Sequence, residues 1–471
     1  MLNQTLQEKY PHLEISVLKL SEVQKDNESK RIDSEFFKKE YFDAMETMQL
    51  NQVEYLGDNM KFNSRYSQPK YDETSKMKVI NSQYIRNEYI DYENAKSGYG
   101  KIVPKESVLI NATGVGTLGR VFINILDFDF SIDSHINVIV VKNKTYLNPY
   151  FLAIFLQSYY GQIQIIRYYS GTSGQIEIYP RDFNYFKIPI FPMEFQLEIQ
   201  NLVKDSHKAL EESKELYKKA EETLYLELGL DPKNPLQSLL DSKTNNPTNS
   251  PNISIHTLKE SFLKTGRLDS EYYQSKYEDI EKFIKSYPNG YDSFSSIINN
   301  KDTNFTPKNN ENYSYIELAN IGNNGNISEP ISDLGKNLPT RARRIVSKGD
   351  VIISNIEGSL SSCALITQEF DKHLVSTGFF VLNSKLLNGE TLLVMFKSQI
   401  FQEYLKKFPS GTILCAINKE ELSKILIPKI DSTTQEKIAK YIQESFNLRK
   451  KSKQLLDNAK IKVEEQIQGK I

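Results

Sequence analysis

The feature that most constrains the fold of this chain is a segment that occurs twice. Ile188-Pro189 followed by Gln196-x-x-Ile199 returns as Ile427-Pro428 followed by Gln435-x-x-Ile438, and the copies align without a gap over roughly forty residues. Each copy predicts the end of a strand, a stop at proline and then a long helix. The chain therefore has two long helices, each preceded by a globular region of similar length.

Three further segments repeat in the same order. Arg31-Ile-Asp-Ser-Glu-Phe-Phe37 corresponds to Arg267-Leu-Asp-Ser-Glu-Tyr-Tyr273, and Ser170-Gly-Thr172 corresponds to Ser410-Gly-Thr412. A looser match relates 107–110 to 350–353. The members of each pair lie about 240 residues apart, which indicates a tandem duplication with small loop insertions.

The duplication sets the expected domain order. Within each globular half, short β-branched runs alternate with short helical patterns, which is typical of a mixed domain. The stretch between the halves is rich in Asn, Pro and Ser and predicts a solvated linker rather than an element. The predicted parts are a first domain at 1–190, a long helix at 191–230, a linker at 231–255, a second domain at 256–430 and a long helix at 431–471. The fold class is α+β: two similar mixed α/β domains separated by two long antiparallel helices, with pseudo-two-fold symmetry.

Both long helices carry small residues on one face at intervals of seven. Small side chains let two helix backbones approach closely, so each helix is the best partner for the other. The alternative is that each amphipathic helix lies on its own domain. The predicted seam consists of Ile199, Ser206, Ser213 and Ala220 in the first helix, and Ile438, Ser445, Ser452 and Ala459 in the second.

Composition limits the partners and the compartment. The net charge of the 471-residue chain is −1, so DNA binding would have to rest on local basic patches. Two cysteines, Cys363 and Cys415, cannot form a disulfide framework, which favours a reducing, cytoplasmic location. The longest apolar run, Tyr150–Leu156, is far shorter than the roughly 20 residues of a membrane-spanning helix. No secretory signal is expected at the N-terminus and no membrane partner is predicted.

Two motifs invite a catalytic interpretation, but their context argues against it. Gly114-Val-Gly116-Thr-Leu-Gly119 has the letters of a dinucleotide or S-adenosylmethionine loop, yet the residues after it predict a strand rather than the required helix. A glycine-rich turn or bulge is favoured. Asn148-Pro149-Tyr-Phe151 resembles the loop that clamps an extruded base in amino-methyltransferases, but Pro149 also suits the first position of a helix.

Neither catalytic nor metal-binding constellations are predicted. The acidic pairs Asp33/Glu35 and Asp269/Glu271 fit the start of a helix better than paired catalytic carboxylates. The five histidines lack metal-ligand spacing, and the chain lacks a P-loop.

Local basic clusters and polar turns supply the candidate DNA contacts. Arginine and lysine contact phosphates, while Arg, Ser, Thr, Asn and Gln can recognise base edges. The alternative is that these clusters are solvated surface. The candidates are Lys101, Thr113, Thr117, Arg120, Arg167, Ser170, Thr172, Ser173 and Gln175 in the first half, and Arg341, Arg343, Arg344, Ser354, Asn355, Ser359, Ser361, Ser410 and Thr412 in the second.

The order and duplication of these motifs resemble the specificity subunit of a type I restriction–modification enzyme. The matching features are the two Ile-Pro…Gln-x-x-Ile entries, the Ser-Gly-Thr loops, the Arg-x-Asp-x-Glu segments and Gly349-Asp-Val-Ile-Ile-Ser354. The resemblance covers essentially the whole chain. The first half departs from it, because Glu106-Ser107 stands where Gly349-Asp350 stands in the second.

The resemblance implies a non-catalytic subunit that binds double-stranded DNA. Each domain would recognise one half of a bipartite site, and the chain would bind two methyltransferase (modification) subunits and the restriction/translocase subunits. S-adenosylmethionine, Mg²⁺ and ATP would be bound by those partners and not by this chain. A helix of about 35 residues is about 53 Å long, more than one DNA turn, so the helices would set an untouched spacer.

Three other interpretations stay open. The chain could serve as the specificity subunit of another restriction system, or be a DNA methyltransferase in its own right. It could also be a two-headed scaffold that does not touch DNA. A methyltransferase is hard to fit into this length together with two recognition domains.

Overall fold

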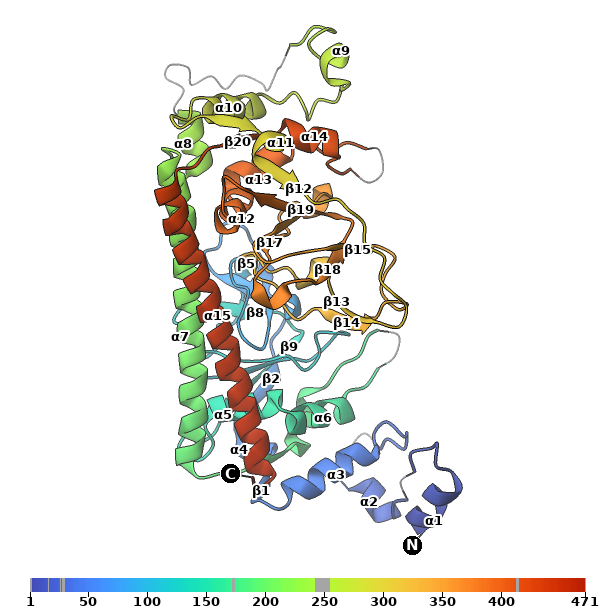
Figure 1. Ribbon diagram of the computed structural model, residues 1–471. Helices are drawn as coiled ribbons and strands as arrows, with labels where there is room; N and C mark the ends of the chain where they lie inside the picture. Colours follow the sequence, from blue (N-terminus) through green and yellow to red (C-terminus); the bar gives the residue numbers. More distant parts are fainter. Residues whose placement is uncertain are drawn as a thin grey trace. The chain divides into compact units, whose positions relative to one another are not determined.

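The computed structural model describes residues 2–15, 17–25, 27, 30–171, 174–241, 255–411 and 415–470. It divides into two compact units. Unit 1 comprises Met1–Glu211 with Arg449–Ile471, and unit 2 comprises Glu212–Leu448. The same order of elements can be followed in both units in Figure 1.

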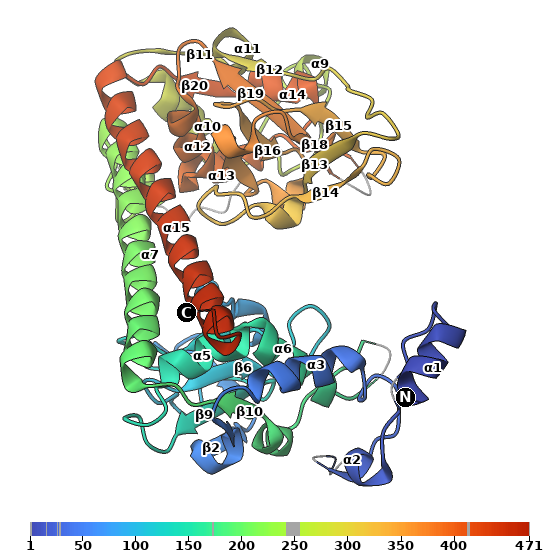
Figure 2. The same cartoon turned by 60° about the horizontal axis from the view of Figure 1, so that its bottom comes forward.

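Unit 1 is built on an antiparallel sheet with the strand order β2-β9-β6-β7. Its strands are β2 (Met60–Arg65), β9 (Ile136–Val141), β6 (Val108–Asn111) and β7 (Val121–Ile123). Side chains alternate across it: Val108 and Ile110 enter one core cluster, while Leu109 enters another. The helices α5 (Pro149–Gln157) and α6 (Tyr159–Tyr168) cover the first face, as Figure 2 shows.

The opposite face of this sheet packs on a second, smaller sheet with the order β3-β5-β4-β8. Its strands are β3 (Lys70–Tyr71), β5 (Lys96–Tyr99), β4 (Lys78–Ile80) and β8 (Phe130–Ile132). β4 and β8 pair in parallel, and Phe130 and Ile80 fill the core between the sheets. The remaining short elements of unit 1 are α1 (Leu2–Lys9), α2 (Leu20–Gln24), α3 (Lys39–Met48), β1 (Val53–Tyr55), α4 (Leu56–Asn59), η1 (Ser82–Tyr84), η2 (Pro180–Tyr185) and β10 (Lys187–Pro189).

Unit 2 repeats this plan. Its first sheet has the order β12-β19-β16-β17 and its second the order β14-β13-β18-β15. The strands are β12 (Ile298–Asn300), β13 (Asn312–Ile316), β14 (Ile331–Leu334), β15 (Ala342–Ile345), β16 (Val351–Ser354), β17 (Cys363–Leu365), β18 (Leu374–Ser376) and β19 (Phe379–Ser384). The helical elements are α9 (Phe262–Thr265), α10 (Ser275–Lys285), α11 (Phe294–Ile297), η3 (Leu318–Asn320), η4 (Glu357–Ser359), η5 (Gln368–Phe370), α12 (Gly389–Lys397), α13 (Gln399–Leu405) and α14 (Lys419–Lys424). The predicted α+β class with two similar halves is confirmed.

The repeated Ile-Pro dipeptides end short strands, as predicted. β10 pairs with β1 through Ile188 and Glu54, and β20 (Leu426–Pro428) pairs with β11 (Tyr291–Ser293) through Ile427 and Asp292. The long helices α7 (Met193–Glu227) and α15 (Ser432–Ile467) follow directly. Since proline lacks an amide hydrogen, it ends each strand before the helix begins.

The glutamine that follows each Ile-Pro ties a long helix to its own unit. The Gln196 side chain accepts from Asn148 N at 2.7 Å and donates to Phe191 O at 2.8 Å. The Gln435 side chain accepts from Asn388 N at 2.9 Å and donates to Ile430 O at 2.9 Å. Both glutamines are buried, so these bonds satisfy polar groups away from water.

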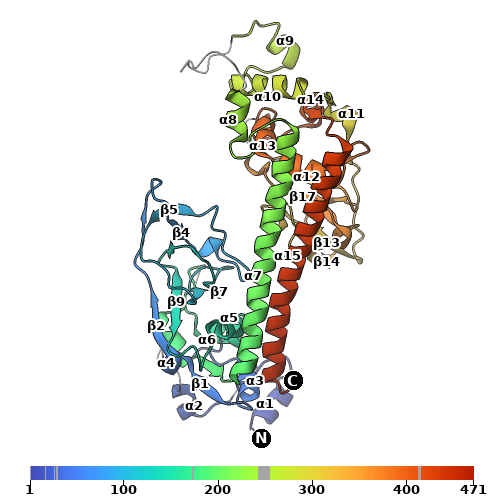
Figure 3. The same ribbon diagram turned by 90° about the vertical axis from the view of Figure 1, so that its left-hand side faces the viewer.

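The two long helices touch through serines. In unit 1, Ser206 Oγ lies 2.9 Å from Ser452 Oγ and donates to the Ser452 carbonyl at 2.8 Å. In unit 2, Ser213 Oγ lies 3.0 Å from Ser445 Oγ, and Ser445 Oγ donates to the Ser213 carbonyl at 2.7 Å. Figure 3 shows the first part of α7 beside the last part of α15 in unit 1. Hydroxyls that bond across the seam allow close approach without leaving a buried polar group unpaired.

The helices run antiparallel within each unit. In unit 1, Lys462 pairs with Glu198 at 2.9 Å, one turn or more beyond the serine contact on both helices. In unit 2, Thr434 Oγ1 donates to Glu227 Oε2 at 3.0 Å. The other seam residues are fully buried: Ile199 and Ala459 in the core of unit 1, and Ala220 and Ile438 in the core of unit 2. Within each unit the two helix segments therefore pack on each other and on the core of that unit.

Two local predictions are wrong. The predicted linker at 231–255 contains helix α8 (Pro235–Asp241), and Leu239 from it is buried in the core of unit 2; 242–254 lie outside the described residues. Asp33 and Asp269 do not start helices, because α3 and α10 begin several residues later. Each aspartate instead accepts a backbone hydrogen bond within a turn.

Candidate nucleic-acid interface

In unit 1 the glycine turn between β6 and β7 meets the base of the Ser-Gly-Thr loop. Gly114 N donates to Ile176 O at 3.0 Å, and Glu177 forms bridges with both Thr113 and Ser170. Segments about sixty residues apart in the sequence are thus joined into one cluster, the turn–loop cluster of unit 1 (113–119 and 170–177).

The glycine motif forms a turn, as predicted. Gly114, Gly116 and Gly119 have φ angles of +91°, +79° and +81°, a region that favours glycine. Leu118 N donates to Gly114 O at 2.9 Å, and the chain continues into β7. A helix N-terminus that could bind a pyrophosphate does not follow this turn in the described structure.

Unit 2 builds the same cluster from 355–362 and 410–417. Ile356 and Ser410 both form bridges with Ala416. Glu357 N donates to Cys415 O at 3.0 Å, and Ile417 N donates to Asn355 O at 2.8 Å. The short helix η4 replaces the glycine turn. The two polar segments singled out in each half are therefore brought together in each unit.

The hydroxyl and amide candidates differ in their access to solvent. Gln175 and Ser361 are exposed. Thr113, Thr117, Ser170, Asn355, Ser359 and Ser410 are half-buried. Thr113 Oγ1 lies 2.9 Å from His135 Nδ1, and Thr117 Oγ1 donates to Thr113 O at 2.8 Å. Thr172, Ser173 and Thr412 lie outside the described residues.

Two of the cationic candidates are exposed. Lys101 is exposed beside the rings of Phe62 and Tyr66, with Nζ 4.7 Å from each centroid. Arg341 is exposed at the end of the loop before β15. Arg343 is half-buried, and its Nε donates to Thr340 O at 2.9 Å.

Arg120 and Arg344 are half-buried and bind backbone carbonyls. Arg120 Nη2 donates to Gly116 O at 2.7 Å, and Arg344 Nη1 donates to Phe379 O at 2.5 Å. Burial lowers the pKa of each guanidinium from its ordinary value, although both stay charged near neutral pH. These hydrogen bonds stabilise the glycine turn in unit 1 and the edge strand β15 in unit 2.

Two predicted DNA contacts are wrong. Arg167 is only 5 % exposed, and its guanidinium carbon lies 3.7 Å from the Tyr41 ring centroid and 4.3 Å from that of Phe36. Its side chain is part of the core under α6. Ser354 is 2 % exposed, and its Oγ lies 2.7 Å from Ser359 Oγ.

The sequence prediction missed Arg65, which joins the cluster from β2. Its Nη1 lies 3.0 Å from Glu177 Oε2 beside the loop base. A hydrogen bond from Tyr179, together with the pairing to Arg65, holds the pKa of Glu177 below its ordinary value. Arg181 stands close by, with its guanidinium 5.3 Å from the Tyr179 ring. Nothing near Arg65 in the sequence signals this role, because strand pairing brings it there.

The described ranges contain neither a candidate metal site nor a candidate membrane-spanning helix. They contain no group of three or more His, Cys, Asp or Glu side chains that could hold a metal ion. Among the helices described, none is long and apolar enough to cross a membrane.

Comparison with known proteins identifies part of the chain. Residues 43–222 match the family model of the type I restriction modification DNA specificity domain. The predicted family is confirmed for this segment. The segment contains the whole described turn–loop cluster of unit 1 and most of α7.

A curated relative is the type I restriction enzyme HindI specificity subunit of Haemophilus influenzae. It is 29% identical over 129 residues, which span 26% of this chain and 28% of the relative. Among solved structures, the S subunit of a type I restriction–modification system from M. genitalium has 12% identity and a TM-score of 0.42, covering 88% of this chain and 95% of that one. The HsdS subunit of Thermoanaerobacter tengcongensis has 14% identity and a TM-score of 0.28, covering 89% and 97%.

The match to the specificity-domain family lies mostly in unit 1, and the turn–loop cluster that it contains has a counterpart in unit 2. The strand order of the first sheet, the loop base and the glutamine anchor are the same in both units. Unit 2 thus repeats the first sheet, the loop base and the glutamine anchor of unit 1 outside the matched segment.

Proposed function

We propose that this chain is the non-catalytic DNA sequence-specificity subunit of a type I restriction–modification complex. Each unit recognises one half of a bipartite double-stranded site with its turn–loop cluster. The observation that carries the proposal is the duplicated cluster, placed on the same sheet edge in both units and in unit 1 inside the specificity-domain match. Rigid scaffolds that present polar loops suit base recognition.

The exposed cations of each unit contact phosphates in this proposal. Lys101 in unit 1 and Arg341 in unit 2 are the strongest candidates because both are exposed. The half-buried Arg120 and Arg344 keep the turn and strand in shape. Phosphate contacts fix the position on DNA, while Gln175, Ser361 and the loop tips contact bases.

The partners in this proposal are two methyltransferase subunits, seated on the long helices, and the restriction/translocase subunits. S-adenosylmethionine, Mg²⁺ and ATP belong to those partners. The two matched serine pairs of the seam give the helices pseudo-symmetry, which suits two identical partners.

Methylation-sensitive sequencing of the host genome, with and without this gene, tests the function. The expected result is a bipartite motif that is methylated only when the gene is present. An identical methylation pattern in both strains would contradict the proposal. If the purified chain alone methylated DNA in the presence of S-adenosylmethionine, the methyltransferase interpretation would replace it.

The exposed cations can be tested on the full-length chain in its complex. Lys101→Glu and Arg341→Glu should each weaken binding to every duplex and lower the slope of log K against log salt by about one. Leu386→Ala, at an exposed site in unit 2, is the control. A salt slope that stays at the wild-type value in both variants would remove these residues from the interface.

The spacer proposal has its own test. Inserting four residues after Ser213, and four after Ser445 to preserve pairing, lengthens each helix by about 6 Å. The preferred spacer should grow by one or two base pairs (about 3.4 Å each) while both half-sites persist. An unchanged spacer would show that the helices do not set it.

A further inference from the structure

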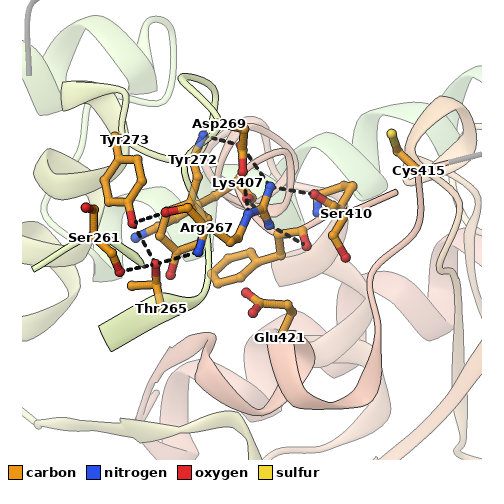
Figure 4. Close-up of polar contacts among 12 residues, drawn as sticks. Ser261, Thr265, Arg267, Asp269, Tyr272, Tyr273, Lys407, Ser410, Cys415 and Glu421 are labelled. Atoms are coloured by element: carbon orange, nitrogen blue, oxygen red, sulfur yellow. Dashed lines mark hydrogen bonds and ion pairs between the residues drawn. The ribbon is translucent and has the colours of Figure 1, made fainter. Parts of the chain in front are cut away.

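Each unit contains an arginine–aspartate fork at the same place in the repeat. Arg31 Nε and Nη2 each donate to an Asp33 carboxylate oxygen at 2.7 Å. Arg267 Nε and Nη2 donate to Asp269 at 2.7 and 2.9 Å. Figure 4 shows the fork of unit 2. A bidentate pair fixes the plane of the guanidinium as well as its position.

The rest of each guanidinium binds the end of the helix that precedes the Ser-Gly-Thr loop. In unit 1, Arg31 Nη1 donates to Arg167 O at 3.2 Å and to Tyr169 O at 2.7 Å, just past the end of α6. The last carbonyls of a helix lack helical partners, and a cation is favourable there.

Unit 2 has the same arrangement after α13. Arg267 Nη1 donates to Phe408 O at 3.3 Å, and Nη2 donates to Pro409 O at 2.8 Å. The side chain of Arg267 is only 12% exposed, so these bonds are largely shielded from water.

The carbonyl bound by each fork lies one residue before the residue that closes the loop. Ser170 N donates to Glu177 O at 2.8 Å, and Ser410 N donates to Ala416 O at 2.9 Å. The fork therefore fixes the chain as it enters the loop, and the bridge fixes its exit. Two attachments leave the loop little freedom at its base.

An aromatic ring packs against the guanidinium of each fork. The Arg31 guanidinium lies 5.1 Å from the Phe36 ring centroid, and that of Arg267 lies 4.6 Å from Tyr272. Asp33 and Asp269 each also accept the backbone N–H of that aromatic residue, at 3.2 and 3.1 Å. Each guanidinium is thereby fixed by a carboxylate, by carbonyls and by a ring, while the aspartate side chains are 45% and 46% exposed.

We propose that Arg31 and Arg267 are positioning residues that set the half-site specificity of their own units without touching DNA. The inference rests on the proposed function. Because the guanidinium fork connects one aspartate to several carbonyls, lysine cannot replace it: an ammonium keeps the charge but not the planar geometry. A loop whose support is slightly loose loses base discrimination before it loses phosphate contacts.

The test uses the full-length chain with its methyltransferase partners. Binding is measured to a duplex that carries the bipartite motif found by methylation-sensitive sequencing, and to duplexes with single base changes in either half-site. Arg267→Lys should lower discrimination at the half-site of unit 2 about tenfold and leave the other unchanged. Arg31→Lys should do the reverse. Hydrogen exchange should speed up at Ser410 and Ala416 in the first variant. The matched controls, Leu268→Ala and Ile32→Ala, change exposed neighbours and should match the wild type.

Each result either supports or overturns the positioning role of Arg31 and Arg267. Unchanged discrimination in folded Arg267→Lys, or equal loss at both half-sites, overturns the inference. If that variant unfolds, Asp269→Asn removes one side of the fork, and a folded Asp269→Asn chain with normal discrimination also overturns it. A wild-type complex that prefers no bipartite site overturns the proposed function and this inference with it.

Discussion

The two units share their first sheet strand for strand and differ in the second. β2-β9-β6-β7 corresponds to β12-β19-β16-β17, and each second sheet has one parallel pair, which lies at the edge in unit 1 (β4 and β8) and in the centre in unit 2 (β13 and β18). The fourth strand is on opposite edges: β3 joins β5 in unit 1, while β15 joins β18 in unit 2. β15 carries Arg343 and Arg344, whereas the matching segment of unit 1 is joined to β8 by a bridge at Ile102. The layer that supports the turn–loop cluster is kept, and the edge beside it diverges, as two different half-sites would require.

Each unit also has a buried cation close to its arginine–aspartate fork, and the two cations have different surroundings. Arg167 and Lys407 occupy matching positions and are 5 % and 9 % exposed. Lys407 forms an ion pair with Glu281, and Arg167 is surrounded by aromatic rings. Met45 stands in unit 1 where Glu281 stands in unit 2. The cation of unit 2 thus has a carboxylate partner and also lies 4.9 Å from the Tyr272 ring centroid, whereas the cation of unit 1 is stabilised by cation–π contacts.

Removing the unit 2 cation should have the largest effect. Lys407→Met leaves the Glu281 carboxylate without its main partner, and we expect a loss of about 3 kcal/mol in the free energy of unfolding. The double variant Lys407→Met/Glu281→Met imitates unit 1 at position 281 and should recover most of it. Arg167→Met should cost only about 1 kcal/mol. Urea unfolding of the full-length chain measures all three, and equal losses at the two cations would contradict the distinction.

Substitutions in the helix seam should lower the free energy of unfolding by similar amounts in both units. Ser452→Leu in unit 1 and Ser445→Leu in unit 2 place a large side chain between close helices, and each should cost about 2 kcal/mol. The alanine variants should cost about 1 kcal/mol, because each leaves a buried partner hydroxyl. Thermal unfolding provides the measurement. A leucine variant as stable as its alanine counterpart would show that the seam has room to spare.

The turn before β6 in unit 1 and the corresponding turn before β16 in unit 2 differ in backbone strain. Glu106 and Gly349 occupy this turn with φ angles of +58° and +86°. Glu106→Gly should stabilise unit 1 by about 0.5 kcal/mol, after loss of its exposed pair with Lys144. Gly349→Ala should destabilise unit 2 by about 1 kcal/mol, because a side chain there is strained. Shifts of the same sign in the two variants would refute this explanation.

The smallest predicted effect is the loss of the fork's contribution to stability at acid pH. The hydrogen bond from Arg31 holds the pKa of Asp33 below its ordinary value. This contribution to stability is therefore complete above the unfolded pKa and is lost as pH falls through the lower folded pKa. Asp33→Asn should flatten the acid limb of the stability curve between those values, as urea midpoints measured from pH 5 to pH 2.5 will show. An unchanged slope would mean that Asp33 is not paired in solution.

The sequence predicted elements whose signals are local or repeated. The Ile-Pro strand ends, the glycine turn and the length of α7 and α15 follow from proline, glycine and helical periodicity. The place of Pro149 at the start of α5 is also confirmed, and the structure adds a cap by Asn148, whose side chain accepts from Tyr150 N at 2.9 Å.

Features that depend on distant partners escaped prediction. Arg167 looks like a surface cation in its own segment, and only the rings of Phe36 and Tyr41, far away in sequence, show that it is buried. Arg31 was recognised through its repeat, but Asp33 beside it was assigned to a helix start; the fork was missed because the carbonyl partners of Arg31 lie far away in sequence, in the region of 167–169. Local composition likewise could not place α8, whose Leu239 is ordered by the core of unit 2.

The division of α15 between the units has a consequence for biosynthesis. The core of unit 1 includes Leu456, Ala459, Val463 and Ile467, all from the last part of that helix. A ribosome therefore releases every residue of unit 2 before it supplies the final pieces of unit 1. The unit whose synthesis starts first is completed last, and a nascent chain stopped at Leu448 would leave an apolar surface open on unit 1 until a chaperone or a protease met it.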